Sequence, residues 1–244
     1  MARWGLSLAL AAGFCPPGLA QTDQHGLLRS ASGTIEYRML KDKALRATEQ
    51  WTLMVHSDGT RTLNTRILNR EAASRTTIVH RVDADFRPLD TFVERWVGDA
   101  YQGIGLFSRR GAQITGLSRG RAAEHSHEVV VPDDVTLISH ALAADAWQVV
   151  PRDLALGDTF QMTAYSIEFA PNAAVPLLGS LLRAPVQWIG RETITVPAGR
   201  FDTTHMRLAA RFDVWFFGPD RTLARMVHEE LGREYLLIEY HGPR

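Results

Sequence analysis

Hydrophobic and polar residues alternate along most of the chain. Ile35, Tyr37 and Met39 fall on one face of an extended segment, while Glu36 and Arg38 fall on the other. This period of two is the pattern of a half-buried β-strand. Turn residues separate the segments that show it. The same pattern predicts strands at 51–55, 60–70, 74–83, 89–97, 100–108, 111–117, 158–169, 185–196, 200–208, 211–217, 222–230 and 233–240.

One segment departs from this period. Within residues 135–149, apolar side chains recur three and four positions apart, as on one face of a helix. Asp133 and Asp134 are suited to cap its start, and Pro151 ends it. A sheet of so many strands must curl to bury its apolar face and protect its edges. We therefore predict a mainly β fold, a curved antiparallel meander that forms a barrel or half-barrel, with one helix near 135–149 that covers or plugs it.

The start of the chain has a different composition. A basic residue, Arg3, precedes an apolar stretch at 4–14, and small residues surround Leu19. This is the layout of a cleaved secretory signal peptide. We therefore expect a signal peptide at 1–20, a single β-barrel-like domain at 21–244, and a periplasmic location for the mature protein.

The single cysteine of the chain, Cys15, lies inside this leader. Because Phe14 rather than a small residue precedes it, we do not expect acylation as a lipoprotein. Pro16 and Pro17 interrupt the apolar run well short of the roughly 20 residues that a membrane anchor needs, and no later segment is long and apolar enough to be transmembrane. A mature protein without cysteine excludes thiol catalysis and disulfides, and we expect no cofactor.

The charge of the chain adds one exclusion. It carries 27 basic and 27 acidic side chains, and the two signs are interspersed. A surface that binds nucleic acid would show a basic stripe, and so would a surface for anionic membranes. We therefore expect no nucleic acid partner.

The C-terminal third of the chain contains a recognisable set of motifs. They are LGDTF at 156–160, GRETITVPAGRFDT at 190–203, DVWFFGPD at 213–220, and a last strand that ends at Tyr240. Together they resemble a bacterial family of exported all-β proteins that is catalogued as a domain of unknown function. The resemblance implies export and a curved antiparallel barrel, related in shape to lipoprotein-carrier and lipocalin-like folds. It supplies no catalytic residues.

A rolled sheet of this kind either fills its interior with side chains or holds one small apolar ligand. The candidates to line such a cavity are aromatic and polar residues of the predicted strands: Trp51, Trp96, Trp188, Trp215, Tyr165 and Glu192. The apolar segment at 170–185 is too short to span a bilayer. We interpret it as a loop folded over the open end of the barrel. A lid, a membrane-dipping loop and a contact surface for an envelope protein are the alternatives.

Two titratable residues fall on apolar faces of neighbouring predicted strands. His80 lies between Ile78 and Val82, and an imidazole titrates near neutral pH, as a general base requires. Glu94 lies between aromatic residues, where desolvation favours the protonated form that a general acid needs. If the two strands pair, these residues can form a proton-transfer pair. The alternative is a polar contact that completes the core, or a face inverted by one bulge.

His125 and His127 form the most metal-like pattern of the chain. On a strand they point to the same side, as two imidazole ligands of one zinc ion must. A third ligand is not visible at a diagnostic spacing, and the neighbouring charges favour an exposed strand end. We therefore expect no bound metal.

Two classes of function are compatible with this sequence. In the first, the protein binds or carries an apolar small molecule or lipid in the cavity. In the second, the cavity is the active site of a cofactor-free acid–base enzyme, a hydratase, lyase or isomerase, in which His80 and Glu94 move protons. Binding ranks first, because it needs only a preformed pocket and few polar groups.

Overall fold

Fifteen β-strands form one continuous sheet. The computed structural model describes residues 26–121, 123–149, 155–169 and 177–243. In chain order the strands are β1 (Leu27–Met39), β2 (Leu45–His56), β3 (Arg61–Asn69), β4 (Ser74–Val82), β5 (Pro88–Val97), β6 (Ala100–Arg110), β7 (Gln113–Gly120), β8 (Glu124–Val130), β9 (Thr136–Ile138), β10 (Thr159–Phe169), β11 (Leu177–Val196), β12 (Gly199–Leu208), β13 (Phe212–Phe217), β14 (Thr222–His228) and β15 (Arg233–His241). The helix among the described residues is the 3-10 helix η1 (Leu142–Gln148). The prediction of a mainly β fold is confirmed.

The first and last strands of the chain, β1 and β15, lie side by side near the middle of the sheet. β1 pairs with β2 on one side and with β15 on the other. From β1 the strands follow in order to β8 at one edge, and from β15 they run back to β10 and then β9 at the other edge. The neighbouring strands are antiparallel except for β9, which runs parallel to β10.

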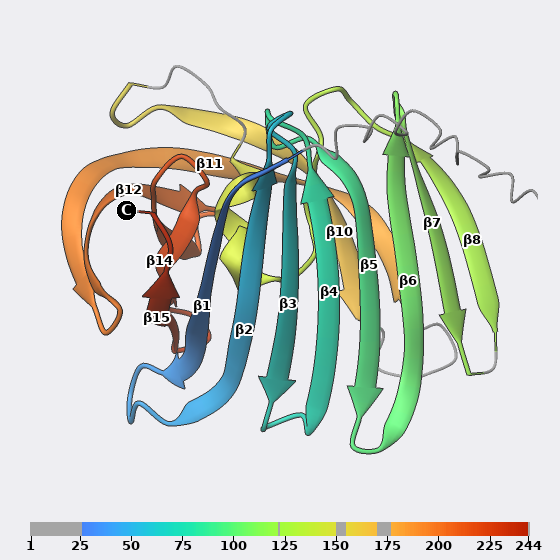
Figure 1. Cartoon of the computed structure of the whole chain (residues 1–244), viewed down its shortest axis with the longest axis horizontal. Coiled ribbons are helices and arrows are strands. Elements are labelled where there is room, and N and C mark those ends of the chain that lie inside the picture. Colours follow the sequence, from blue (N-terminus) through green and yellow to red (C-terminus); the bar gives the residue numbers. More distant parts are fainter. Residues whose placement is uncertain (1–25, 122, 150–154, 170–176, 244) are drawn as a thin grey trace, which may run out of the picture.

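The sheet curls until its two edges approach each other. The chain leaves edge strand β8 at Val130 and enters the opposite edge strand β9 at Thr136. Because an extended chain advances at most about 3.5 Å per residue, this connection spans no more than roughly 20 Å. Figure 1 shows the result, with β2–β6 side by side in front and β10 passing behind them. The predicted curved, barrel-like meander is therefore confirmed.

Side chains join the two halves of the sheet across its interior. Tyr165 of β10 is fully buried against Phe107 of β6 and His127 of β8, and its hydroxyl is hydrogen-bonded to the His127 Nε2 atom. The Leu177 amide of β11 donates a hydrogen bond to the Ser118 hydroxyl of β7 at 3.2 Å. These contacts hold β10 and β11 against β6–β8, strands that lie far away in the order of the sheet.

The helix is shorter and begins later than predicted. Residues 136–138, which we expected to be helical, form β9, because their backbone pairs with β10 at the edge of the sheet. His140 then adopts a left-handed backbone with φ 63°, which turns the chain, and Ala141 immediately precedes the first helical residue. Asp133 and Asp134 therefore do not cap the helix.

The 3-10 helix η1 lies inside the curled sheet and plugs it. Six of its seven residues are buried, and it packs against β9 and β14. Trp147 lies against His80 of β4 and Phe86 of the following turn, with ring centroids 5.7 and 6.0 Å away. The interior of the sheet is thus filled around a helix as well as by strand side chains.

The apolar segment at 170–185 is not a loop over its described length. Residues 177–185 are the first part of β11 and pair with β10, because the hairpin extends further than the alternation predicts. Residues 170–176 and the expected signal peptide at 1–20 lie outside the described residues. Among the described residues, no helix has the length and hydropathy needed to cross a membrane.

Gly179 of β11 leaves room for the Tyr165 ring. A Cβ atom at this position would lie 2.1 Å from the Tyr165 ring, far inside van der Waals contact. We expect Gly179→Ala to lower the free energy of unfolding by about 1–3 kcal/mol, the usual cost of overpacking a core, as measured by urea denaturation. The control is Ser180→Ala on the exposed face, which should change it by less than about 0.5 kcal/mol. Equal effects of the two substitutions would contradict this packing.

Candidate functional site

A cavity of about 400 Å³ lies between η1 and strands of the C-terminal half of the sheet. Much of its wall is apolar: Met162, Leu182, Ala184, Leu208, Phe212 and Met226. Polar side chains of η1, of the turn before it, of β1 and of β15 also line it: Asp145, Gln148, His140, Tyr37, Arg233 and Tyr235. Both the volume and the mixed lining are typical of a small-molecule site.

A buried carboxylate holds the start of η1. The alternation of β2 directs Glu49 to the interior, where it is fully buried. Its Oε2 atom accepts hydrogen bonds from the Leu142 amide at 3.0 Å and the Tyr37 hydroxyl at 2.6 Å. Its Oε1 atom accepts a hydrogen bond from the Ala143 amide at 3.1 Å. Glu49 thereby satisfies two of the amides that a helix start leaves without intrahelical partners.

Burial dominates the electrostatics of this contact. Desolvation raises the pKa of Glu49, although the hydrogen bonds from Tyr37 and from the helix amides oppose the rise. The pKa of Tyr37 also rises, because its side chain is buried and adjoins the Glu49 carboxylate. Tyr37 therefore stays protonated and remains a donor to Glu49.

Asp145 of η1 is the carboxyl group that lines the cavity. Burial, together with the charge of Glu49, raises the pKa of Asp145 to about 7. A hydrogen bond from the Gln148 side-chain amide at 2.8 Å opposes this rise. Both protonation states of Asp145 are therefore populated near neutral pH.

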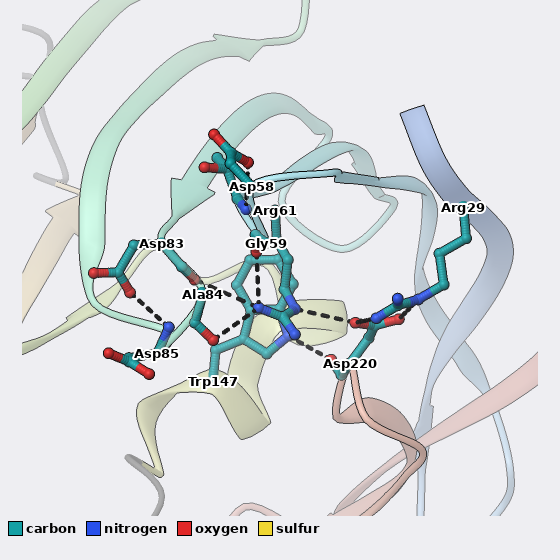
Figure 2. A network of polar contacts seen from close by, with 10 residues as sticks. Arg29, Asp58, Gly59, Arg61, Asp83, Ala84, Asp85, Trp147 and Asp220 are labelled. Atoms are coloured by element: carbon teal, nitrogen blue, oxygen red, sulfur yellow. Dashed lines mark hydrogen bonds and ion pairs between the residues drawn. The ribbon is translucent and has the colours of Figure 1, made fainter. Parts of the chain in front are cut away.

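A second network holds the other end of η1. The Trp147 indole N–H donates a hydrogen bond to the Asp220 carbonyl oxygen at 2.8 Å. Figure 2 shows Arg29 and Arg61 reaching the Asp220 carboxylate from opposite sides, with N–O distances of 2.8 and 3.0 Å. Arg61 is buried, and it also donates to the Ala84 carbonyl at 3.1 Å. The helix is thus tied to β1, to β3 and to the turn between β13 and β14.

The structure does not bring the predicted acid–base pair together. His80 faces the interior, where its Nδ1 atom lies 2.8 Å from the hydroxyl of Thr91, its direct neighbour on β5. Glu94 is three positions from Thr91 and pairs with Thr77, so it points to the outer face of the same strands. Burial lowers the pKa of His80 to about 4, so this imidazole is neutral at pH 7. The strands are neighbours, but the sheet separates the two side chains.

None of the six residues expected to line a cavity borders this one: Trp51, Trp96, Trp188, Trp215, Tyr165 and Glu192. Trp51 and Tyr165 are core residues, 4% and 0% exposed. Glu192 accepts a hydrogen bond from the Trp215 indole at 2.8 Å on an exposed part of the sheet. The alternation identifies which side chains point inward, but it does not show where space remains between them.

The two histidines of the metal-like pattern lie on β8, as expected. His127 packs against Tyr165, and a Cβ atom on the facing Gly116 would lie 2.5 Å from its ring. His125 is partly exposed on the same strand. Among the described residues, no group of three or more His, Cys, Asp or Glu side chains is arranged to hold a metal ion. The contacts of His127 are those of a packing residue.

Three residues around η1 did not emerge from the sequence as site residues: Tyr37, Glu49 and Asp145. Glu49 shows the same pattern as His80, since it is a titratable residue on the apolar face of a strand. Asp145 is the one acidic residue of the helical segment. Each could therefore have been noticed separately. Their proximity depends on the curl of the sheet and is not encoded locally.

Asp145 should make stability depend on pH in a defined direction. Its folded pKa lies above its ordinary value, so the folded protein retains a proton that the unfolded chain loses between about pH 4 and 7. The stability that this proton supplies is complete below about pH 4 and is lost as the pH rises through about 7. We expect Asp145→Asn to remove this loss. As the pH rises from about 4 to 7, the free energy of unfolding of the variant should therefore increase relative to that of wild type by up to about 1.4 kcal/mol per pH unit.

Urea denaturation of both proteins between pH 4 and 8 measures this difference. Comparing the two proteins cancels the contributions of His80 and of other groups that do not interact with Asp145. Asp90→Asn, which neutralises an exposed aspartate paired with Arg81, is the control and should track wild type. Parallel curves for Asp145→Asn and wild type would show that Asp145 titrates normally.

Solved structures provide a comparison for the fold. A beta-barrel-like protein of the domain of unknown function DUF1849 from Brucella abortus aligns over 89% of this chain and 99% of its own, with 10% identity and a TM-score of 0.53. A Bacteroides fragilis protein with a YmcC-like fold aligns over 87% of this chain and 95% of its own, with 11% identity and a TM-score of 0.30. No protein-family model and no curated protein matches the sequence. The expected resemblance to an all-β family of unknown function is confirmed as a similarity of fold.

Proposed function

We propose that the protein is exported and that it binds or carries an apolar small molecule or lipid in the cavity beside η1. The observation that carries this proposal is the cavity of about 400 Å³ with its apolar wall. Small-molecule sites are usually preformed, mainly apolar and supplied with few polar groups. The hydrogen bonds of Glu49 and Trp147 support a preformed site, because they fix both ends of η1, which forms one side of the cavity.

Affinity in such a site comes mainly from apolar burial. Removing apolar surface from water contributes about 25 cal/mol per Å², or ~0.8 kcal/mol for each buried methylene group. A ligand with an alkyl chain therefore gains about fourfold in affinity per methylene for as long as the cavity accommodates the chain.

Export is supported by the leader of the chain. Arg3, the apolar stretch at 4–14 and the small residues around Leu19 have the layout of a signal peptide. The single cysteine lies in that leader, so the mature protein folds without a disulfide. Its stability then rests on strand pairing and on the core, which the continuous sheet supplies.

Acid–base chemistry on a hydrophobic metabolite is the second candidate function, and Asp145 is the observation that favours it. A carboxyl group that is partly protonated near neutral pH can both donate and accept a proton. Asp145 lines the cavity, whereas His80 and Glu94 do not. An enzyme of this kind would lose turnover in Asp145→Asn while it still bound its substrate.

A series of straight-chain alcohols from hexanol to decanol tests the binding function. We expect saturable binding of one molecule per protein, with affinity rising about fourfold for each added methylene until the cavity is full. Isothermal titration calorimetry measures the dissociation constants. Affinity that does not depend on chain length would contradict apolar burial as the source of binding.

Ala184→Phe locates the site. Ala184 of β11 is buried in the wall of the cavity, so a phenylalanine there should fill the space and weaken decanol binding by at least about tenfold, roughly 1.4 kcal/mol. Arg183→Phe places the same side chain on the exposed face of the same strand and should bind like wild type. Circular dichroism verifies that both variants are folded. Undiminished binding by a folded Ala184→Phe would place the ligand elsewhere.

A further inference from the structure

We propose that the ligand of this cavity is a lipophilic amine, an apolar molecule whose ammonium group pairs with Asp145. This inference rests on the proposed binding function and adds the charge of the ligand. Three features of the cavity support it: a carboxylate that no described residue pairs with a positive charge, a second carboxylate close to it, and aromatic rings beside it.

The partner of the Asp145 carboxylate among the described residues is neutral. Its Oδ1 atom accepts the 2.8 Å hydrogen bond from the Gln148 amide. Over the part of the chain that the structure describes, no lysine, arginine or histidine forms an ion pair with Asp145. A carboxylate removed from water is stabilised by a positive donor at hydrogen-bond distance. An ammonium group in the cavity would be such a donor.

A second carboxylate makes the site more negative. Glu49 is fully buried, and its charge acts on Asp145 directly. The hydrogen-bond partners of Glu49 are neutral as well, a tyrosine hydroxyl and two backbone amides. Two neighbouring acidic groups without a cation favour a positive charge placed beside them.

The two basic residues that also line the cavity do not neutralise Asp145. Arg233 reaches Glu71 at 3.5 Å and is hydrogen-bonded to the Tyr235 hydroxyl, but it forms no ion pair with Asp145. The His140 Nε2 atom is hydrogen-bonded to the Ile167 carbonyl at 2.6 Å, and burial lowers the pKa of His140, so the ring is neutral at pH 7. Among the described residues, the charge that acts on Asp145 is that of Glu49, which is negative.

Aromatic rings at the same end of the cavity favour the same ligand. Tyr37 and Tyr235 both line it, with ring centroids 5.0 Å apart in an edge-to-face contact. The faces of aromatic rings attract cations, and the attraction grows where water is excluded. The apolar wall then receives the rest of the molecule. An uncharged ligand would bring no positive charge to the Asp145 carboxylate, and an anionic ligand would be repelled by both acids.

Decylamine, decanol and decanoic acid test the charge of the ligand, because they share one alkyl chain and differ in the head group. At pH 8 the amine is protonated and Asp145 is mainly ionised. By isothermal titration calorimetry, we expect wild type to bind decylamine at least about tenfold more tightly than decanol, and decanoate more weakly than either. In Asp145→Asn, the affinities for decylamine and decanol should differ by less than about threefold.

Two controls separate charge from folding. Asp90→Asn removes an exposed negative charge on β5 and should keep the full preference for the amine. Wild type at pH 5, where Asp145 is protonated, should lose most of that preference, and this measurement stands even if Asp145→Asn does not fold. Equal affinities of wild type for amine and alcohol, or a preference that survives in Asp145→Asn, would overturn the inference and leave the binding function intact. Binding of none of the three compounds would overturn both.

Discussion

The hydrogen bonds from the Leu142 and Ala143 amides to the Glu49 carboxylate determine what occupies the interior of this sheet. A curled sheet with an apolar inner face packs its own side chains together unless another element takes up the space. Here η1 occupies that space. The start of a helix buried in a core needs acceptors for the amides that have no partner within the helix. Ala141, the residue before the helix, has no side-chain acceptor, so β2 supplies one from far away in the sequence.

Placing that acceptor in the core has an electrostatic consequence. The charge of Glu49, added to the effect of burial, raises the pKa of Asp145 on the same helix. The contact that positions η1 therefore also sets the protonation of the group that lines the cavity. At the other end, the bond from Trp147 to Asp220 fixes the helix to a turn whose carboxylate is held by two arginines. Structure and candidate site thus depend on the same polar groups.

The alternation of side chains was enough to predict most of the strands and the curl, because each strand buries one face and the sheet has too many strands to stay flat. It did not predict that residues 136–138 would form a strand, because this depends on a partner at the far edge of the sheet. His80 and Glu94 lie on paired strands, as the proton-transfer hypothesis requires, yet a spacing of three from Thr91 turns Glu94 outward. The residues around the cavity could not be predicted, because Glu49 and Asp145 approach each other only after the sheet has curled.

Hydrogen exchange at the Leu142 and Ala143 amides tests most directly whether Glu49 anchors the plug. Glu49→Leu keeps a side chain of similar size on the inner face of β2 but offers no acceptor to these amides. If Glu49 holds η1, both amides are protected in wild type and exchange at least about tenfold faster in Glu49→Leu, while β2 and β3 keep their protection. Unchanged protection of both amides in the variant would show that packing alone positions the helix, and would contradict the role assigned to Glu49.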